Sequence, residues 1–406
     1  MDDLDHRNLG VQLNLWHLQE DAPGMVFWHP RGYAVYRVLE DYVRRKMRRA
    51  GYAEVRTPQL LPREFWDRSG HWEKFGEHMF RIDDGELAMA LKPMSCPCHV
   101  QIFNKRLRSW RELPIRYAEF GACHRNDPSG SLHGIMRTRA FEQDDAHVFC
   151  REQDVEDEVA GFIALLDEAY RDLGFPDYEV ALATRPAARA GSDASWDWSE
   201  AKLGDAARRR GLALHINPGE GAFYGPKLEF ALRDRLGRSW QCGTVQLDGV
   251  LPQRLAASYI APDGSRARPL MIHHAIFGSL GRIIAILLEH HDGVLPFWLS
   301  PDQVAVAPIS KDQAGYGADV VAAFEAAGIR AVAYDGAETL SRRIVAAHAM
   351  AVPVIAVVGR REMRDGRVSL RERDGAQADL PLAEAVSRLQ ARDRPGAPVA
   401  EASRTG

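Results

Sequence analysis

Three short windows of this 406-residue chain hold residues that could do chemistry. They are LKPMSCPCHV (91–100), CHRNDPSGSLHGIMRTRAFEQDDAH (123–147) and MIHHAIFGSLGR (271–282). Together they contain a thiolate candidate, several imidazoles and a dense set of arginines. Zinc favours Cys and His ligands, and three protein ligands with an open position are typical of a working site rather than a structural one. Arginine guanidinium groups bind phosphate oxygens in pairs. The combination predicts nucleotide chemistry beside a substrate-binding metal.

The middle window predicts an antiparallel hairpin. If its end is a strand, period-two alternation places one set of side chains on a common face, namely Phe141, Gln143, Asp145 and His147. Such a polar face is poorly suited to a core, because each buried polar group would need a partner. The run 115–125 also alternates as a strand, and NDPSGSLHG between the two is rich in turn formers. The hairpin would carry Arg125 before its long loop and Arg137 after it.

These windows resemble the class II aminoacyl-tRNA synthetases, specifically the threonyl type, from about Asp5 to about Gln390. Motif 1 of that family, a long helix followed by a strand ending in proline, matches an amphipathic stretch followed by AEVRTP, which ends at Pro58. The apolar positions of the stretch are Tyr36, Leu39, Val43 and Met47. Motif 2 matches the hairpin with Arg125. Motif 3 matches GSLGRIIAILL with Arg282.

The resemblance implies one zinc ion per subunit, bound by Cys96, His147 and His273. Taken singly, each of these residues is more typical of a small buried thiol or a hydrogen-bonded structural histidine. Spacing alone does not assign the three, because they are far apart in sequence. Their common place in matching motifs favours the metal site.

The resemblance also implies the nucleotide contacts of an ATP-dependent activation step. Arg125 and Lys227 would hold the α-phosphate, Arg137 and Arg282 the γ-phosphate, and Arg125, Lys227 and Arg282 would be the catalytic residues. Mg²⁺ would bridge phosphate oxygens. The remaining ATP contacts would be Phe141 against adenine, Asp127 at the adenine edge, and Gln241 and Thr244. The family has glutamate where this chain has the shorter Asp127.

A zinc site would explain how such a protein selects L-threonine. Threonine and valine have nearly the same shape, and an apolar pocket separates them poorly. A metal with open coordination can bind the α-amino and β-hydroxyl groups together. On the strand WQCGTVQLD, Thr244 and Gln246 share a face. The resemblance implies a threonine pocket completed by Met94, Gln143, Asp145, Tyr224 and Gln246.

The chain divides into two predicted domains and a tail, with an overall α/β fold class. Residues 1–297 would form an α+β catalytic domain with the antiparallel sheet of class II synthetases. Beyond the proline-containing junction LPFWLSPDQ, short apolar runs alternate with helical patterns, which predicts an α/β domain over 298–393. This domain resembles the family's anticodon-binding domain, with Glu362 and Arg371 at anticodon-reading positions. The Pro/Ala/Ser/Gly-rich tail, 394–406, is predicted to be disordered.

Composition and partners fit a cytoplasmic enzyme that binds tRNA locally. The net charge of −4 gives no global attraction to nucleic acid, so contact with threonine tRNA must use local basic patches. Five cysteines without framework spacing favour a reducing compartment. The start MDDLDHRNLG does not resemble a signal peptide, and no run is apolar enough for a membrane span. Motif 1 implies a homodimer through residues 36–58.

The match begins at the catalytic core, so we expect a short form without the amino-terminal TGS and editing domains, unable to hydrolyse mischarged serine. Several positions depart from the family pattern: Cys98, Asp127, His274, Gly281 and the stretch 334–337. Cys98 is either an inert substitution or a competing thiolate. Two alternatives therefore stay beside a threonyl-tRNA synthetase. One is a paralogue that activates threonine or an analogue for an acceptor other than tRNA, and the other is a non-catalytic regulatory paralogue.

Overall fold

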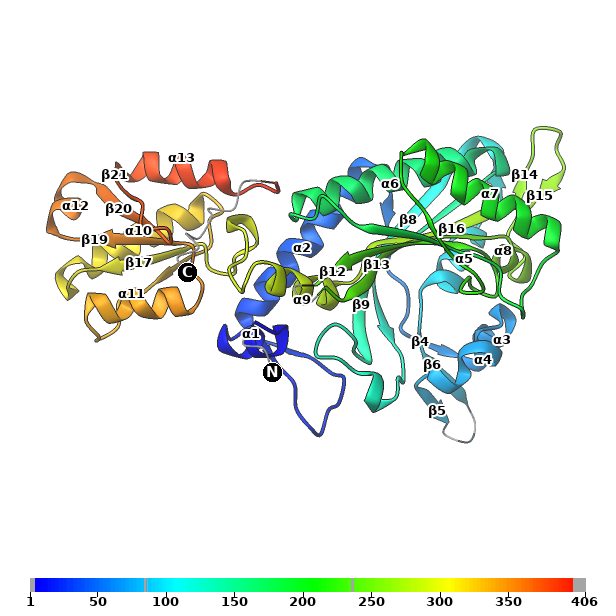
Figure 1. Cartoon of the computed structure of the whole chain (residues 1–406), viewed down its shortest axis with the longest axis horizontal. Coiled ribbons are helices and arrows are strands. Elements are labelled where there is room, and N and C mark those ends of the chain that lie inside the picture. The colour runs from blue at the N-terminus through cyan, green and yellow to red at the C-terminus, as the bar shows by residue number, and fades with distance from the viewer. Residues whose placement is uncertain (1–3, 84, 86, 235–236, 397–406) are drawn as a thin grey trace. The chain divides into compact units, whose positions relative to one another are not determined.

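The computed structural model describes residues 4–83, 85, 87–234 and 237–396. Most of the tail predicted to be disordered, residues 397–406, lies outside this range. These described residues divide into two compact units: those within 18–26 and 39–286 form one, and those within 4–17, 27–38 and 287–396 form the other. Helices and sheets are mixed in both units (Figure 1), which confirms the predicted α/β class.

An eight-stranded, largely antiparallel sheet is the centre of the first unit. Its strand order is β11-β10-β12-β13-β16-β9-β8-β3, and only the outermost pairs, β10/β11 and β3/β8, are parallel. The strands are β3 (Ala53–Glu54), β8 (Ile115–His124), β9 (Ala140–Cys150), β10 (Glu179–Ala183), β11 (His215–Asn217), β12 (Lys227–Arg233), β13 (Ser239–Asp248) and β16 (Leu270–Ser279). Strands β8 and β9 are the predicted hairpin, paired from Ile115 with Phe149 to His124 with Ala140.

Helices cover both faces of this sheet, and the period-two alternation decides which side chain meets which helix. On one face, α6 (Val155–Asp172) brings Phe162 against His274, with ring centroids 4.1 Å apart, and α7 (Asp193–Arg209) packs beside α6. On the other face, α5 (Cys96–Asn104) packs Phe103 on Phe149 at 4.5 Å. His273 and His274 therefore point to opposite faces.

Shorter elements surround the large sheet. Two three-stranded sheets are ordered β4-β6-β5 and β15-β14-β7. Their strands are β4 (Leu60–Pro62), β5 (Arg81–Asp83), β6 (Ala88–Leu91), β7 (Arg108–Ser109), β14 (Tyr259–Ile260) and β15 (Arg266–Ala267). The accompanying helices are α3 (Arg63–Ser69), α4 (His71–Phe75) and α8 (Val250–Arg254). Two longer helices, α2 (Pro30–Arg49) and α9 (Leu280–His290), cross the division between the units.

The strand expected up to Pro58 is shorter than predicted. The helix α2 ends at Arg49 and β3 covers only Ala53–Glu54, although the N–H of Val55 still donates to the carbonyl of Ala118 at 2.8 Å. The next opportunity for pairing is lost because the N–H of Thr57 donates to the Glu119 carboxylate at 2.7 Å. Pro58 has no N–H to give.

The second unit is built on a five-stranded sheet in the order β18-β17-β19-β20-β21. Three strands are parallel, β17 (Val304–Pro308), β18 (Ala331–Ala333) and β19 (Val354–Val358), and two are added antiparallel, β20 (Arg367–Glu372) and β21 (Gln377–Pro381). The helices are α10 (Ala314–Ala326), α11 (Leu340–Ala349), α12 (Arg360–Asp365) and α13 (Leu382–Arg392). Its amino-terminal part holds α1 (His6–Gln12), β1 (Trp16–His17) and β2 (Phe27–Trp28). The sequence patterns did not predict α12 and β21, and they did not predict α1, β1 and β2.

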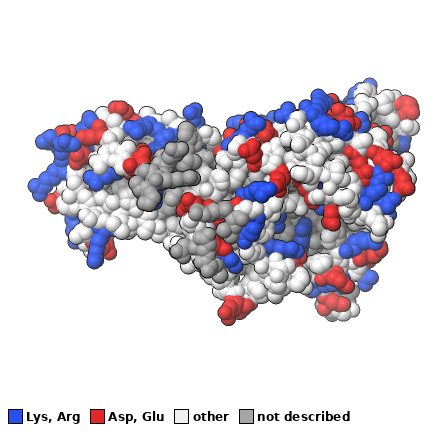
Figure 2. All heavy atoms as spheres, viewed as in Figure 1, with Lys and Arg blue, Asp and Glu red and all other residues white. Residues whose placement is uncertain are grey.

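Surface charge is mixed in sign. Figure 2 shows Lys and Arg interspersed with Asp and Glu over the displayed face, in keeping with the small net charge of −4. Among the described residues, no helix is both long and apolar enough to cross a lipid bilayer.

Candidate active site

One row across the large sheet gathers predicted residues from four strands. Lys227 on β12 pairs with Gln246 on β13, Gln246 pairs with His273 on β16, and His273 pairs with His147 on β9. Side chains at paired positions project from the same face of a sheet. Hydrogen-bond register therefore brings these four residues side by side, although they are far apart in sequence.

Cys96 joins this row from the first turn of α5 and completes a compact cluster with His147 and His273. The ligand atoms of the three residues all lie within 4.8 Å of one another, and all three side chains are buried. The Nε2 atom of His147 is buried without a hydrogen-bond partner. Such an atom is costly unless something binds it. One sulfur and two imidazoles are a donor set that suits zinc.

The protonation of the cluster follows from its burial. Burial lowers the pKa of His147 well below its usual value, so the imidazole is neutral, which is the form that binds metals. Burial raises the pKa of the Cys96 thiol, and the carboxylates of Asp145 and Asp248 add to this effect. A bound dication would oppose both causes and favour the thiolate.

Two residues that the sequence analysis missed lie within hydrogen-bond distance of the imidazole nitrogens of His273 and His147. Asp248 Oδ2 lies 3.0 Å from Nε2 of His273, and His99 Nδ1 lies 2.8 Å from Nδ1 of His147. Both could have been found from spacing. Asp248 continues the alternation of Thr244 and Gln246 along one strand face, and His99 stands three residues after Cys96, on the same side of a helix.

The residues predicted to bind the amino acid lie around the cluster. The hydroxyl of Tyr224 donates to Gln246 Oε1 at 2.6 Å, and the Tyr224 ring lies 5.5 Å from that of His273. Asp145 Oδ1 is 3.8 Å from Nε2 of His147, and burial raises the pKa of Asp145. The thioether of Met94 is 2.9 Å from Nε2 of His71, which lines a small cavity together with Cys96 and Tyr224.

A larger cavity of about 410 Å³ is lined by seven of the eight residues predicted to contact ATP, all except Lys227. They are Arg125, Asp127, Arg137, Phe141, Gln241, Thr244 and Arg282. Gln143 and Gln246, predicted for the amino acid, also line it, so the cavity reaches the row that carries the cluster. The sequence analysis did not anticipate further lining residues, among them Phe75, His78, Met136 and Thr138.

Three arginines concentrate positive charge in this cavity. The guanidinium of Arg125 lies 5.1 Å from the centre of the Phe141 ring, and Arg137 Nε donates to Asp127 Oδ2 at 2.9 Å. Arg282 Nε donates to the carbonyl of Met136 at 2.9 Å. Burial lowers the pKa of Arg282, and the charges of Arg125 and Arg137 lower it further. A polyanion would relieve this repulsion.

Lys227 stands slightly apart from the arginines. It does not line the large cavity, and its ammonium forms an ion pair with Glu229 Oε1 at 2.6 Å. Its strand position nevertheless places it directly beside Gln246. Asp127, which is shorter than the glutamate of the family, uses one carboxylate oxygen to bind Arg137.

The unusual residues fall outside the cluster. His274 faces the opposite side of the sheet, where Nε2 lies 2.7 Å from the Tyr52 hydroxyl and burial lowers its pKa to about 3. Cys98 packs among apolar side chains that include Phe65 and Trp66, and burial raises its pKa to about 11. A Cβ on Gly281 would lie 3.0 Å from the carbonyl oxygen of Ile135, which leaves little room for a side chain.

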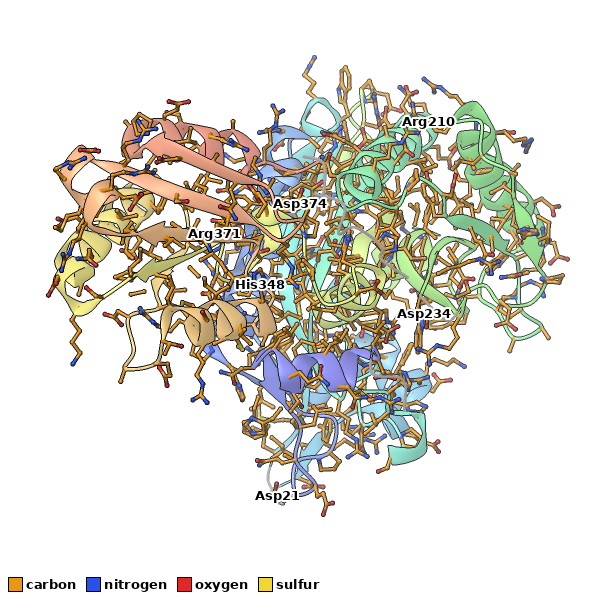
Figure 3. The ribbon with its side chains drawn as sticks, turned by 60° about the vertical axis from the view of Figure 1, so that its left-hand side comes forward. Asp21, Arg210, Asp234, His348, Arg371 and Asp374 are labelled. Atoms are coloured by element: carbon orange, nitrogen blue, oxygen red, sulfur yellow. The ribbon has the colours of Figure 1, made fainter. Side chains whose placement is uncertain are left out.

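The two residues predicted to contact an anticodon lie in the second unit. Glu362 is on α12, where its carboxylate accepts the N–H of Gly359 at 3.0 Å. Arg371, labelled in Figure 3, is on β20, and its backbone pairs with Ile355 and Gln377. The altered stretch 334–337 follows β18, and the N–H of Tyr334 donates to the carbonyl of Val306 at 2.7 Å.

Comparison with known proteins identifies the family. The model of the tRNA synthetase class II core domain (G, H, P, S and T) matches residues 78–291, and that of the anticodon binding domain matches residues 303–392. The crystal structure of the RNA binding domain of threonyl-tRNA synthetase from Cryptosporidium parvum Iowa II superposes with a TM-score of 0.93 at 38% identity, covering 98% of this chain and 99% of that one. The chain belongs to the threonyl-tRNA synthetase family of class II.

Bacterial members of the family are closer in sequence. A protein named threonine–tRNA ligase from Granulibacter bethesdensis is 53% identical over 390 residues, which are 95% of this chain and 61% of that protein. One of the same name from Caulobacter vibrioides is 54% identical over 388 residues, covering 95% and 59%. This threonyl-tRNA synthetase family member thus spans about three fifths of the length of such curated relatives.

Proposed function

We propose that the chain activates L-threonine with ATP and transfers it to the 3′ end of threonine tRNA, releasing pyrophosphate and AMP. The observation that carries this proposal is that two features share one face of the large sheet. The Cys96, His147 and His273 cluster and the arginine-lined cavity lie on one side of one sheet, joined through Gln246. Family membership and the names of the relatives support the same reaction.

The chain's own residues account for the activation step by positioning and charge. An oxygen of the threonine carboxylate attacks the α-phosphorus of ATP, the bond to the β-phosphate oxygen breaks, and pyrophosphate leaves. Arg125 and Lys227 would neutralise the α-phosphate, while Arg137 and Arg282 would hold the far end of the triphosphate, together with Mg²⁺. Preorganised charges of this kind lower the barrier without covalent help from the protein.

The cluster of Cys96, His147 and His273 is our proposed zinc site, one per subunit. A zinc ion held there would supply an open coordination position for the amine and hydroxyl of the amino acid. Tyr224, Gln246 and Asp145 surround the cluster with one hydroxyl, one amide and one carboxyl group. These groups are suited to orient an ammonium and a hydroxyl, and they exclude a purely apolar side chain by leaving polar groups unpaired.

The second step transfers the threonyl group to RNA. A ribose hydroxyl at the tRNA 3′ end attacks the carbonyl carbon of threonyl-adenylate, and AMP leaves. The second unit contains the segment that matches an anticodon binding domain, so we propose that it contacts the tRNA, with Glu362 and Arg371 among its contacts. Charging of tRNA takes place where translation does, and we therefore also propose a cytoplasmic location.

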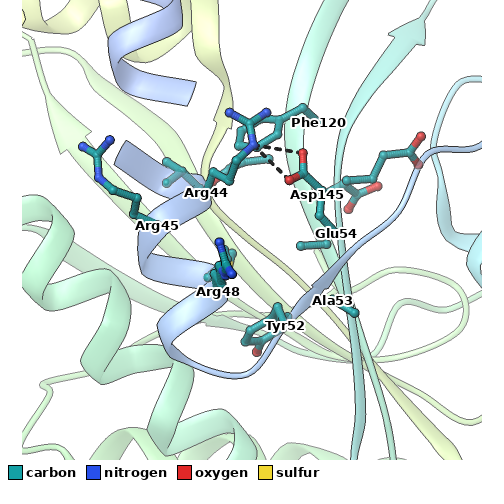
Figure 4. A pocket seen from close by; sticks show the side chains of 13 residues that line it. Arg44, Arg45, Arg48, Tyr52, Ala53, Glu54, Phe120 and Asp145 are labelled. Atoms are coloured by element: carbon teal, nitrogen blue, oxygen red, sulfur yellow. Dashed lines mark hydrogen bonds and ion pairs between the residues drawn. The ribbon is translucent and has the colours of Figure 1, made fainter. Parts of the chain in front are cut away.

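We further propose a homodimer through α2 and β3. A cavity of about 400 Å³ opens between these elements and β8 (Figure 4), lined in part by Met47, Tyr52 and Phe120. Arg44 at its edge is paired with Glu54, whereas Arg45 and Arg48 are exposed. An apolar hollow edged by cations suits a second copy of the chain, and closed two-fold dimers are the common soluble assembly.

Two assays on the same preparation test the proposed reaction. Threonine-dependent exchange between pyrophosphate and ATP reports activation, and attachment of labelled threonine to threonine tRNA transcripts reports transfer. Both should be positive. Exchange without charging would contradict tRNA as the acceptor and favour a different one, a possibility raised by the altered stretch 334–337. The absence of both would contradict the proposal.

A further inference from the structure

The imidazole of His147 is one end of a buried chain of hydrogen bonds. Its Nδ1 atom lies 2.8 Å from Nδ1 of His99, and Nε2 of His99 lies 3.1 Å from Oε2 of Glu119. The two imidazole rings are nearly perpendicular, with centroids 4.6 Å apart. His147 and His99 are fully buried and Glu119 is 3% exposed, so no solvent competes for these contacts.

Glu119 is locked at the far end of the chain by donors on its other oxygen. Oε1 accepts the N–H of Thr57 at 2.7 Å and the ammonium of Lys92 at 3.0 Å. The Thr57 hydroxyl lies within 3.1 Å of both carboxylate oxygens and accepts from Lys92 at 2.9 Å. Although burial opposes ionisation, hydrogen bonds from His99 and Thr57 and the charge of Lys92 hold the pKa of Glu119 at about 2.

When both imidazoles are neutral, this hydrogen-bond geometry allows only one order of protons along His147, His99 and Glu119. A carboxylate can only accept, so Nε2 of His99 must carry a proton and donate it to Glu119. Nδ1 of His99 then carries the lone pair and accepts from His147. Nδ1 of His147 therefore carries the proton, and its Nε2 carries the lone pair. That Nε2 is the buried atom without a hydrogen-bond partner, in the cluster with Cys96.

We infer that Glu119, acting through His99, holds His147 in the tautomer whose Nε2 can bind a metal ion. This inference rests on the zinc site of the proposed function. Glu119 and His99 would be positioning residues: neither belongs to the cluster of Cys96, His147 and His273, yet together they would set both the ring orientation and the available nitrogen of one ligand. Outer partners of this kind typically change metal affinity about 10–100-fold when they are lost.

The substitution Glu119→Gln should reverse the direction of the hydrogen bonds between His147, His99 and residue 119, while the side-chain shape at position 119 stays the same. The two N–H donors on the Oε1 position, Thr57 and Lys92, require the amide oxygen there, so the NH₂ group must face His99. Nε2 of His99 would then accept, its Nδ1 would donate to His147, and the proton of His147 would move to Nε2. The matched control is Thr57→Val, which removes a hydroxyl that contacts Glu119 but leaves the carboxylate facing His99.

Zinc affinity, measured by competition with a chromophoric chelator, tests the inference. We expect Glu119→Gln to bind zinc about 10–100-fold more weakly than the parent protein, and Thr57→Val to bind within about threefold of it. In a His99→Phe background, which removes both ring nitrogens, adding Glu119→Gln should change the affinity no further. Equal zinc affinity in Glu119→Gln and parent protein would overturn the inference.

Imidazole ¹⁵N spectra of the zinc-free parent protein supply a second measurement that needs no variant to fold. His147 should carry its proton on Nδ1 and His99 on Nε2, and the reverse order would overturn the inference. The two proposals fail differently. A parent protein that binds no zinc removes the proposed metal, whereas a zinc-binding parent with the wrong tautomers removes only the role of Glu119.

Discussion

His147 and His273 face each other on adjacent antiparallel strands, with ring centroids 4.8 Å apart and ring planes nearly perpendicular. Both side chains are buried, and each has a polar partner behind it, His99 for His147 and Asp248 for His273. Their separation is therefore set by strand register at the centre of a sheet rather than by a flexible loop. Cys96 is added from the first turn of a helix packed on that sheet.

Cys96→Ser should remove zinc and weaken threonine binding more than ATP binding. Serine is a poor zinc ligand, and in our proposal only the amino acid touches the metal. We expect zinc content to fall from one per subunit to well below one. The KM for threonine in ATP–pyrophosphate exchange should rise by at least about tenfold, while the KM for ATP changes by less than about threefold.

The matched control for this prediction is Cys98→Ser, two residues further along the same helix. Cys98 packs among apolar side chains away from the cluster, so this change should leave zinc content unaltered. Full zinc occupancy and unchanged threonine KM in Cys96→Ser would contradict the assignment of the metal site.

Arg282→Gln should reduce ATP-dependent activation strongly. Arg282 contributes to a cavity in which Arg125 and Arg137 already lower its pKa, so its charge adds to a site built for a polyanion. Loss of one such group should lower kcat/KM for ATP by about 10²–10³-fold in the exchange assay. Arg139→Gln is the control, because Arg139 binds the Asp127 carbonyl and lies outside the residues that line the cavity. An equal loss in both variants would refute a specific phosphate contact.

Elements with a clear local sequence pattern could be predicted, and elements without one could not. The hairpin was predicted because a strand here would place Phe141, Gln143, Asp145 and His147 on one face, and because the loop before them is rich in turn formers. In the second unit, α12 is short and almost entirely polar, and β21 is a half-exposed edge strand. Neither has the apolar periodicity that identifies an element from sequence.

The site was harder to predict than the fold, because sheet register brings its parts together. Nothing local to His273 indicates that it pairs with His147, and resemblance to a family supplied that pairing instead. His99 and Asp248 were missed although their spacing from Cys96 and Gln246 is regular. The replacement His274 could not be interpreted until the alternation of β16 placed it against Tyr52 on the opposite face.

Asp144→Asn should flatten the dependence of stability on pH between about 4 and 7. Asp144 is buried and accepts the N–H groups of Ile276 and Phe277 at 2.9 and 3.0 Å, where the ladder between β9 and β16 is irregular. Burial raises its pKa to about 7, opposed by these backbone donors and reinforced by the charge of Asp145. The folded state therefore holds a proton that the unfolded state has released.

The sign follows from this difference in bound protons. The stabilising contribution of Asp144 is complete below about pH 4 and is lost as the pH rises through 7, by on the order of a few kcal/mol. Asparagine can accept the same N–H groups but does not ionise. The free energy of unfolding, measured with urea across this range, should thus fall less steeply with rising pH in the variant. If the free energy of unfolding depended on pH in the same way in both proteins, the raised pKa of Asp144 would be wrong.

Charge reversal on α2 should weaken the proposed dimer. Arg45 and Arg48 line the cavity of Figure 4 and are exposed, so replacing both by Glu should leave the fold intact. We expect the parent protein to have a dimer mass by light scattering at micromolar concentration and the variant to shift towards the monomer. The control is the exposed Arg210→Glu at the end of α7, which should remain dimeric. A monomeric, active parent protein would count against the assembly itself.

Serine and valine should be rejected to very different degrees in the activation step. Serine offers the same amine and hydroxyl as threonine and lacks only a methyl group, a difference worth about 1–3 kcal/mol, so kcat/KM should favour threonine by roughly 10–200-fold. Valine has the right shape but no hydroxyl. It would leave Tyr224, Gln246 and the open coordination position without a partner, and a site built for a hydroxyl rejects such an analogue by about 10⁴–10⁵-fold. ATP–pyrophosphate exchange with each amino acid measures both ratios. If valine were activated as well as serine, selection would depend on pocket volume, and the proposed polar recognition around His147 and His273 would be wrong.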